Sequence, residues 1–310
     1  MQVFRGIPER SDHGCVLTIG NFDGVHRGHQ ALLAKLVDKS RRSGLPAAVL
    51  TFEPHPREYF TRENRPIRLT SLREKIQLIA GQGVDRLYIG RFNARFAALE
   101  ADRFIEDILI RGLCARHVMI GDDFRFGKGR HGDFAMLQAA GASAGFSVEA
   151  MPTLIHQGER ISSSAVREAL AAGDMAHAGR LLGRPYSISG RVLHGDKIGR
   201  TLGFPTANIQ LKHRSPPLMG IYTVSVDGLA DRPWPGVASV GVRPTINDAG
   251  RPTLEVHLFD WTADCYDAHL RVNFLAKQRD EERYPTLDAL TTQIARDAEL
   301  ARAYFVQNPL

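Results

Sequence analysis

Two histidines that follow an apolar run carry the clearest chemical signal in this sequence. The run Cys15–Ile19 has the composition of a buried parallel strand, a glycine-containing turn follows, and 26–40 has a helical pattern. His26 and His29 are three residues apart, so on a helix they share one face. Backbone amides and the positive end of the dipole at this first turn favour anions and disfavour imidazolium. We therefore expect two neutral rings that donate hydrogen bonds to the phosphates of a nucleotide.

Other interpretations of this pair have less support. The stretch 18–29 contains neither a G-x-G-x-x-G pattern nor a Gly-Lys-Ser/Thr sequence, so it is not one of the two common phosphate loops. A zinc site would need further ligands, and no Cys-x-x-Cys or third cluster supplies them. Two surface histidines without a function are a further alternative. The expected strand, turn and helix around the pair favour the phosphate site.

The composition is that of a globular protein long enough for two domains. The chain has 310 residues, of which 43% are hydrophobic and 24% charged. We expect no membrane helix, because no segment approaches the roughly 20 apolar residues required, and no signal peptide. The three distant cysteines predict free thiols in a reducing compartment, hence a cytoplasmic protein. The net charge of +6 comes from scattered basic residues, which favours small anionic substrates over nucleic acid.

The chain up to about Gly183 alternates strand and helix patterns. This order predicts a doubly wound parallel sheet of the Rossmann-like α/β class, in which ligands bind beyond the carboxyl ends of the strands. The turn before His29 would lie at that edge. The expected strands are Val16–Ile19, Ala47–Phe52, Arg86–Ile89, His117–Ile120 and Ser147–Met151, and the expected helices are His26–Ser40, Leu72–Gly81, Asp102–Arg111, Phe134–Ala144, Ala165–Ala172 and Asp174–Leu182.

After Gly183-Arg184-Pro185 the pattern changes to short strands separated by turns. We therefore expect a domain boundary here, with one domain over 1–183 and a second, a small antiparallel β-barrel with a terminal helix, over 184–310. The expected barrel strands are Tyr186–Leu193, Gly220–Val226, Val237–Val242, Leu254–Phe259 and Leu270–Phe274. The expected last helix is Leu287–Val306, with one apolar stripe formed by Leu287, Leu290, Ile294, Ala298 and Ala301.

Two stretches of the first domain place polar or aromatic residues after expected strands. His55 lies between two prolines in 51–56 and is either a functional polar group or a turn residue. The stretch 121–130 combines glycines, aromatic rings and positive charge. It predicts a basic loop over phosphates, with Phe124 or Phe126 packed on a planar ring, and the alternative is a surface loop with an aromatic anchor.

A third stretch places hydroxyls at the start of an expected helix. Ser162, Ser163 and Ser164 precede Arg167 by about one helical turn. Hydroxyls and amides at that position suit a phosphate, and the arginine could neutralise developing charge. Simple N-capping would explain the serines but not Arg167.

In the second domain, 195–208 is a glycine-rich turn that ends in Pro-Thr-Ala-Asn. Glycines allow backbone amides to approach phosphates closely. Thr206 and Asn208 are two residues apart, so on an extended segment their oxygens face the same way. Neutral oxygen ligands together with ATP phosphates would suit Mg²⁺, and a polar barrel turn fits the spacing equally well.

The expected strand Leu254–Phe259 places Glu255, His257 and Phe259 on one face. A lone glutamate on a strand usually faces solvent. Beside a phosphate loop, Glu255 becomes a candidate general base for a substrate hydroxyl.

The motifs of the first domain resemble, in order, those of the prokaryotic FMN adenylyltransferase domain: TIGNFDGVHRGH, TFEPHP, GDDFRFG and ISSSAVR. The family usually has threonine where Ser164 stands, and serine keeps the hydroxyl. The resemblance implies that FMN attacks the α-phosphorus of MgATP, giving FAD and pyrophosphate. It implies that His26 and His29 bind the ATP phosphates, and that Arg167, Ser163 and Ser164 bind the leaving pyrophosphate. The residues with implied substrate contacts are Gly20, Asn21, Phe22, Asp23, Gly24, His55, Asp123, Phe124 and Phe126.

The motifs GRTLGFPTAN, GIY, VGVRPT and LEVHLFD of the second domain resemble riboflavin kinase. The resemblance implies that Thr206 and Asn208 bind Mg²⁺ and that Glu255 deprotonates the 5′-hydroxyl of the ribityl chain. One departure concerns the flavin side, where the family commonly has Leu-Tyr-Gly and this chain has Cys265-Tyr266-Asp267. The remaining residues with implied substrate contacts are Gly195, Gly199, Arg200, Gly203, Tyr266 and Arg279.

Together the resemblances cover about residues 15 to 298 and imply a bifunctional enzyme. The second domain would convert riboflavin and ATP into FMN and ADP, and the first would convert FMN and ATP into FAD, both with Mg²⁺. An adenylyltransferase for another phosphorylated substrate is one alternative, against which the second-domain motifs argue. A flavin-binding regulator without catalysis is another, and the intact set of His26, His29, Thr206, Asn208 and Glu255 argues against it.

Overall fold

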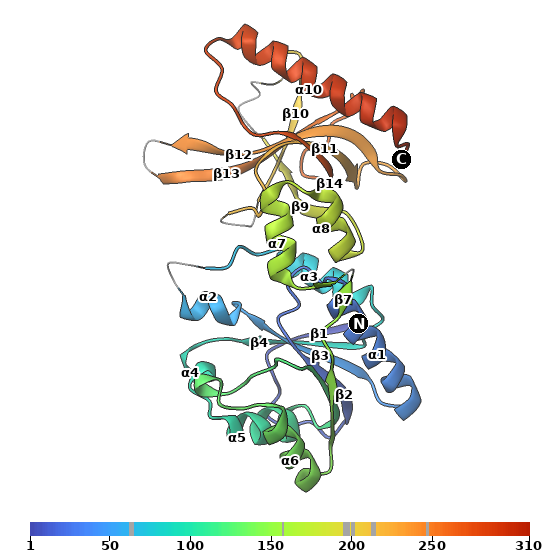
Figure 1. The fold of residues 1–310 in the computed structure, drawn as a ribbon, viewed down its shortest axis with the longest axis vertical. Coiled ribbons are helices and arrows are strands. Elements are labelled where there is room, and N and C mark those ends of the chain that lie inside the picture. Colours follow the sequence, from blue (N-terminus) through green and yellow to red (C-terminus); the bar gives the residue numbers. More distant parts are fainter. Residues whose placement is uncertain (62–64, 157, 195–198, 200–201, 212–214, 246–247) are drawn as a thin grey trace. The chain divides into compact units, whose positions relative to one another are not determined.

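The computed structural model describes residues 1–61, 65–156, 158–194, 199, 202–211, 215–245 and 248–310. By their contacts these residues form two compact units (Figure 1). The N-terminal unit comprises Met1–Pro66 and Leu72–Ser162, and the C-terminal unit comprises Ile67–Ser71 and Ser163–Leu310. The two helices just before Gly183 group with the C-terminal unit, and the domain boundary at Gly183 stays a prediction.

The N-terminal unit contains a six-stranded sheet, with parallel pairing throughout, in the order β1-β4-β3-β2-β5-β6. The chain runs outward from β2 on one side and resumes with β5 on the other side, so the direction switches between β2 and β5. Ligands bind at the carboxyl ends of the strands at such a switch point. The strands are β1 (Gln2–Arg5), β2 (Cys15–Ile19), β3 (Ala47–Glu53), β4 (Arg86–Arg91), β5 (Ala115–Gly121) and β6 (Ser147–Met151), with a separate hairpin of β7 (Ile155–His156) and β8 (Glu159–Arg160).

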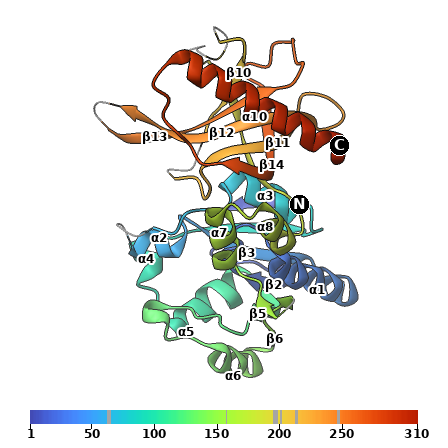
Figure 2. The same ribbon diagram turned by 45° about the horizontal axis from the view of Figure 1, so that its top comes forward.

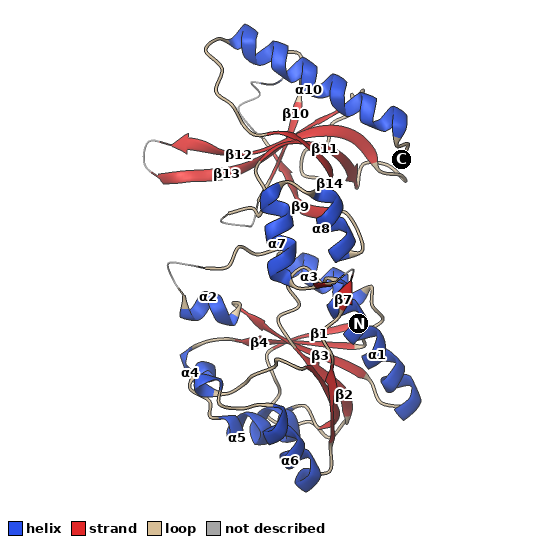
Figure 3. Ribbon diagram, viewed as in Figure 1, coloured by secondary structure: helices blue, strands red, loops and turns tan. Residues whose placement is uncertain are grey.

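Helices cover both faces of this sheet, which confirms the doubly wound class (Figure 3). One core joins α1 and α3 to residues such as Val16 and Val49, and the other joins η1 and α6 to residues such as Leu17 and Leu50. Neighbouring strand residues point to opposite faces, so an apolar run can serve both cores. The helices are α1 (Arg27–Ser43), α2 (Pro56–Phe60), α3 (Leu72–Ala80), α4 (Ala94–Ala97), α5 (Ala101–Arg103), the π-helical η1 (Phe104–Gly112), the short 3-10 turn η2 (Lys128–Arg130) and α6 (Phe134–Ala144).

The C-terminal unit is built on a closed antiparallel barrel in the order β10-β13-β12-β11-β14-β9. Large side chains such as Tyr222 and Phe274 are fully buried and in edge-to-face contact, with ring centroids 5.3 Å apart. The elements are α7 (Ser163–Ala172), α8 (Met175–Leu182), β9 (Tyr186–Leu193), β10 (Thr206–Ile209), β11 (Gly220–Asp227), β12 (Trp234–Thr245), β13 (Asp248–Leu258), β14 (His269–Arg279) and α10 (Leu287–Gln307).

The terminal helix α10 packs on the outside of the barrel, against β11 and β12 (Figure 2). Ala298 and Ala301 are buried against Ile221 and Val237. Leu287 begins the helix and remains 63% exposed, so the expected apolar stripe is buried only toward the carboxyl end of the helix. Among the described residues, the chain has no helix whose length and apolar content would allow it to cross a membrane.

Candidate active sites of the two units

A strained turn follows β2 and leads to the histidine pair. Phe22 and Val25 have φ angles of 48° and 40°, which side-chain-bearing residues rarely adopt. Both side chains are buried, and the Gln30 amide donates to the Val25 carbonyl over 2.9 Å. Strained backbone held by its surroundings is concentrated at functional sites. The predicted contacts Gly20, Asn21, Phe22, Asp23 and Gly24 all belong to this turn.

His26 is the N-cap of α1 rather than its first helical residue. Its Nδ1 accepts the backbone N–H of His29 over 3.3 Å, which leaves the proton of the neutral ring on Nε2. The rings of His26 and His29 are stacked, with centroids 3.7 Å apart. The cap therefore fixes both the tautomer and the orientation of a hydrogen-bond donor at the helix start.

The pKa of His29 lies well below its usual value, so this ring is neutral as the sequence predicts. The main cause is burial, followed by the neighbouring His26 and the positive charge of Lys75. Among the described residues, the buried Nδ1 of His29 has no hydrogen-bond partner. Lys75 on α3 is only 4% exposed, and the sequence did not single it out because a lysine in an amphipathic helix usually faces solvent.

Gly28 lies between the two histidines, where a side chain would press on the His26 ring. A Cβ atom here would lie 3.2 Å from two atoms of the His26 ring and 3.6 Å from the Ile161 carbonyl oxygen. Ile161 comes two residues before the start of α7. The chain therefore passes beside the histidine turn immediately before the predicted phosphate-binding serines.

His55 is 9% exposed and caps α2, with its Nδ1 accepting the Arg57 N–H over 3.1 Å. His55 therefore acts as a turn residue, and since the same bond leaves a proton on Nε2, its role as a functional polar group stays a prediction. The hydroxyl of Thr51, near the end of β3, donates to the Asn21 carbonyl over 3.3 Å, which ties this strand to the turn after β2.

The loop after β5 differs in part from the sequence-based expectation. Phe126 is 5% exposed and packs on Phe104, with centroids 5.1 Å apart, so this ring is the aromatic anchor of the loop. Phe124 is half-buried and stacks on Phe126 at 5.7 Å. The exposed carboxylate of Asp123 pairs with Arg160 at 2.6 Å.

Ser163 and Ser164 open α7, as expected, and Arg167 follows one turn later. The Nε–H of Arg167 donates to the carbonyl of Ile67 over 2.5 Å. Both residues belong to the C-terminal unit, so the segment Ile67–Ser71 orients the guanidinium.

One register row crosses five strands of the barrel. Asn208 pairs with Glu255, Glu255 with Ser239, Ser239 with Ile221, and Ile221 with Arg279. Directly paired residues point to the same face of a sheet. The residues that alternate with them, such as Ala207 and Val256, are buried inside the barrel, so the row faces outward. The predicted metal ligand and the predicted base are therefore adjacent.

The predicted metal ligands Thr206 and Asn208 lie on one face of β10 and are half-buried. A Cβ atom on Gly199 would lie 3.3 Å from the Thr206 hydroxyl, so the glycine-rich turn approaches this site closely. His257 donates its Nδ1–H to the Pro205 carbonyl over 2.9 Å, which positions the segment before Thr206. Within the described chain, no group of three or more His, Cys, Asp or Glu could hold a metal. Neutral oxygens that share Mg²⁺ with ATP fit this arrangement. Gly203 follows in the same turn, whereas Gly195 and Arg200 lie outside the described residues.

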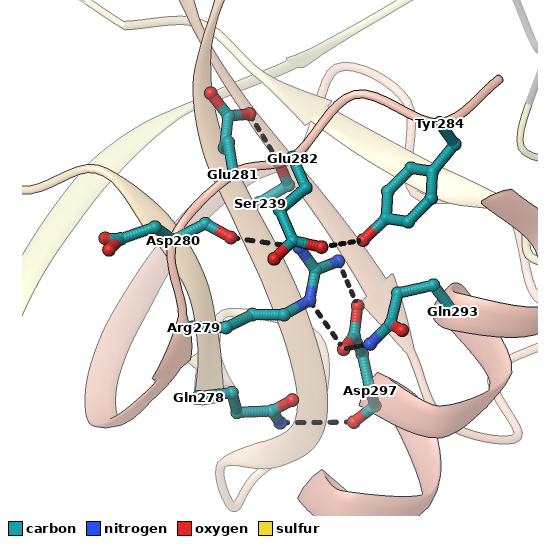
Figure 4. A network of polar contacts seen from close by, with 9 residues as sticks. All are labelled: Ser239, Gln278, Arg279, Asp280, Glu281, Glu282, Tyr284, Gln293 and Asp297. Carbon is teal, nitrogen blue, oxygen red and sulfur yellow. Dashed lines mark hydrogen bonds and ion pairs between the residues drawn. The ribbon is translucent and has the colours of Figure 1, made fainter.

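Arg279 is held by the terminal helix (Figure 4). Its Nε and Nη2 donate to the two carboxylate oxygens of Asp297 over 3.0 and 2.6 Å. Asp297 also accepts from Gln293 over 2.9 Å, and the Arg279 Nη1 donates to the Asp280 carbonyl over 2.9 Å. The hydrogen bonds to Asp297 raise the pKa of Arg279 above its usual value. Each of the three guanidinium nitrogens of Arg279, a predicted flavin contact, thus donates a hydrogen bond within the protein.

Glu281 follows Arg279 by two residues and is hydrogen-bonded to Ser239 of β12 (Figure 4). Its carboxylate accepts from the Ser239 hydroxyl over 3.3 Å and from the Val242 N–H. A Cβ atom on Gly241 would collide with its Oε1, so the carboxylate occupies the space that a side chain at 241 would need. The pKa of Glu281 is raised, mainly by burial and in smaller part by the charge of Glu255. The hydrogen bond from Ser239 and the charge of Arg279 act in the opposite direction. No sequence pattern singled out Ser239, which lies within β12.

The chain turns at Cys265-Tyr266-Asp267, although the glycine that the family commonly has there is replaced by Asp267. Asp267 has a φ of 62°, a conformation that glycine adopts freely and aspartate tolerates better than most residues. Its N–H donates to the Val192 carbonyl over 3.1 Å, and its carboxylate pairs with Arg191 at 3.3 Å. Tyr266 packs on His194, with ring centroids 3.9 Å apart.

Comparison with protein families assigns each half of the chain. The FAD synthetase family matches residues 8–165, and the riboflavin kinase family matches residues 182–305. The chain is 51% identical over 309 residues to the bifunctional riboflavin kinase/FMN adenylyltransferase of Escherichia coli K12, covering 98% of both chains. It is 52% identical over 305 residues to the protein of the same name from Pseudomonas fluorescens, covering 98% of this chain and 97% of that one.

A solved structure has the same fold along nearly the whole chain. The crystal structure of a protein described as a macrolide-efflux protein from Streptococcus pneumoniae superposes with a TM-score of 0.83 at 29% sequence identity. The similarity covers 97% of this chain and 98% of that one. Since both halves match their family and full-length relatives are about half identical, the chain belongs to the bifunctional riboflavin kinase/FMN adenylyltransferase family.

Proposed function

We propose that this chain synthesises FAD from riboflavin at two separate active sites. The C-terminal unit phosphorylates riboflavin with ATP, and the N-terminal nucleotide site transfers AMP from a second ATP to the FMN formed. The observation that carries this proposal is that each predicted set of reactive residues has its own structural basis. The histidine pair lies at the switch point of a parallel sheet, and the pair Asn208 and Glu255 lies side by side on the barrel.

In the adenylyl transfer, a phosphate oxygen of FMN forms a bond to the α-phosphorus of ATP while the bond to pyrophosphate breaks. The attacking group is already an anion, so the protein needs to position the reactants and stabilise charge. We assign the Nε2–H of His26, together with His29, to donation to the ATP phosphates. Ser163, Ser164 and Arg167 would stabilise the departing pyrophosphate.

In the phosphorylation, Glu255 takes the proton of the ribityl 5′-hydroxyl, whose oxygen forms a bond to the γ-phosphorus of ATP while the bond to ADP breaks. Thr206 and Asn208 would hold Mg²⁺ through neutral oxygens. The bound ion neutralises phosphate charge. The turn that contains Gly199 and Gly203, together with Gly195 and Arg200, would bind the ATP phosphates.

The remaining substrate contacts are proposed from position. The strained turn after β2, His55, Asp123 and Phe124 would contact the nucleotide, and Tyr266 and Arg279 would lie toward the flavin. We also propose that the enzyme works in the reducing cytoplasm, since its three cysteines are free thiols.

Two variants test whether the sites are independent. We expect Glu255→Gln to lose about 10²- to 10⁴-fold in FMN formation and to convert supplied FMN into FAD at the wild-type rate. We expect His29→Ala to accumulate FMN from riboflavin and to form little FAD. Chromatography of the flavins measures both. Equal loss of both activities in either variant would contradict the two-site proposal.

A further inference from the structure

Lys75 lies near the start of α3, at the same edge of the parallel sheet as the histidine turn. The chain leaves the carboxyl end of β3, forms α2 and α3, and then enters β4, which runs parallel to β3. A helix in such a crossover runs back against the strand direction, so it begins at the carboxyl edge of the sheet. Lys75 is the fourth residue of α3, and His26 and His29 follow β2 at the same edge.

Lys75 also lies on the face of α3 that packs toward the histidine turn. Leu72 is three residues before it and Ile79 is four residues after it, so the three side chains share one face of the helix. Leu72 and Ile79 pack in one apolar core. The same core contains Phe22 and Val25, the strained residues of the histidine turn. With only 4% of its surface exposed, Lys75 therefore points into the protein beside that turn.

This position is unfavourable for a cation in two ways. Lysine is almost never fully buried unless its charge is compensated. The positive end of the helix dipole also repels a cation in the first turn of a helix. Lys75 interacts with other groups of the protein, and its charge reaches His29, whose pKa it helps to lower. A charge held against such local preferences is typical of a functional site.

The histidine pair itself offers hydrogen bonds rather than charge. His29 is neutral, and the Nδ1 of His26 accepts a hydrogen bond, so neither ring supplies a positive charge in the free protein. The triphosphate of ATP carries several negative charges, and bond breaking moves further negative charge onto the departing pyrophosphate. A buried ammonium group acts on such charge more strongly than an exposed one, because less water screens it.

We infer that Lys75 supplies positive charge to the phosphates of ATP at the histidine turn and stabilises the pyrophosphate as it departs. This inference rests on the proposed adenylyl transfer. The ammonium group acts from the buried face of α3, while His26 and His29 donate the hydrogen bonds. No proton moves to or from Lys75 during the reaction. The charge is in place before ATP binds, so no reorganisation is needed at the moment of transfer.

The first test removes the charge and keeps a side chain of similar length. We expect Lys75→Met to lower kcat/KM for ATP in FAD formation from supplied FMN by about 10- to 100-fold. Riboflavin phosphorylation by the same variant should be unchanged, which also shows that the chain is folded. Lys35→Met is the matched control, because it removes an exposed lysine from α1, and it should leave both activities unchanged.

Two inhibitors that compete with ATP separate an effect of charge from a structural effect. Inorganic tripolyphosphate carries the charge without the nucleoside, and adenosine is the nucleoside without the charge. In Lys75→Met the inhibition constant of tripolyphosphate should rise by about 10-fold or more, whereas that of adenosine should stay the same. Lys75→Arg keeps the charge and should retain most of the activity. Equal weakening of both inhibitors, or an equal loss in the arginine and methionine variants, would overturn the inference.

The outcomes distinguish the role of Lys75 from the proposed function. A wild-type protein that forms no FAD from FMN and ATP would overturn the proposed adenylyl transfer. An active wild-type protein whose kcat/KM for ATP is unchanged in Lys75→Met would overturn the role of Lys75 alone. If Lys75→Met does not fold, Lys75→Gln decides in the same assays, because it removes the charge and stays polar. Wild-type kcat/KM in that variant would contradict the inference.

Discussion

The ion pair between Arg279 and Asp297 should contribute strongly to the stability of the C-terminal unit. The side chains are only 19% and 5% exposed, and two hydrogen bonds join them. Removing one partner of a buried pair usually costs 3–5 kcal/mol. Arg279→Met keeps the aliphatic stem, and Gln293 still donates to the remaining carboxylate, so we expect the lower end, about 3 kcal/mol.

Intrinsic fluorescence can measure this loss in the C-terminal unit specifically. The chain has two tryptophans, Trp234 and Trp261, and both belong to this unit. A loss of 1 kcal/mol shifts the Tm of a domain of this size by about 2–4 °C. Thermal unfolding of Arg279→Met followed by tryptophan fluorescence should therefore occur roughly 6–12 °C lower than in the wild type.

A double variant provides the control. When both partners become apolar, no uncompensated charge stays buried, so Arg279→Met combined with Asp297→Leu should recover most of the lost Tm. A single variant that shifts Tm by less than about 2 °C would refute the assignment of a strong pair. So would a double variant whose loss equals the sum of the two single losses.

Three other predictions concern single residues. Gly28→Ala should lower FAD formation from FMN by about 10-fold or more, because its Cβ presses on the His26 ring, and should leave riboflavin phosphorylation unchanged. The control is Gly81→Ala, whose Cβ makes only ordinary contacts. A similar loss of FAD formation in both variants would count against the role of Gly28. His29 stays neutral in the folded state below pH 6.5 while the unfolded chain takes up a proton, so stability should fall as pH drops below 6.5. His29→Asn should remove up to about 1.4 kcal/mol of that loss per pH unit in urea unfolding, and an unchanged pH slope would contradict the lowered pKa. Asp267→Gly should leave kcat/KM for riboflavin within about twofold of the wild-type value. Asp267→Val should lower Tm, because a β-branched residue disfavours the positive φ at this position. Equal Tm values for Asp267→Val and the wild type would show that the turn does not need this conformation.

The apolar pattern predicted the architecture well because the core imposes it. The strands that line both cores were expected within a few residues of their observed bounds, as for Ala47–Phe52 and β3. In the barrel, β10 was not among the expected strands, β13 begins six residues before its expected start, and β14 ends five residues after its expected end. The strand β1 was not expected, because all of its four residues are exposed and carry no alternating pattern. The segment 102–111 was expected as an ordinary helix, and the i, i+4 and i, i+5 patterns that distinguish η1 are not visible in an apolar periodicity.

The candidate sites were predictable only where one short segment contains them. The histidine turn and the Thr206-Ala207-Asn208 segment are continuous in sequence, so residue types and spacing sufficed to propose them. Arg279 could not be recognised as the partner of Asp297, because 18 residues separate them and the pairing depends on how α10 packs on the barrel. The contact between Glu281 and Ser239 likewise depends on how the segment after β14 lies against β12.

Chromatography of the flavins after the wild-type protein is mixed with riboflavin and MgATP tests the two-site proposal most directly. Two sites in one chain predict that FMN appears first and is then converted into FAD. FMN that accumulates without any FAD would contradict the adenylyl transfer assigned to His26, His29 and their partners. No conversion of either riboflavin or supplied FMN would contradict the account as a whole.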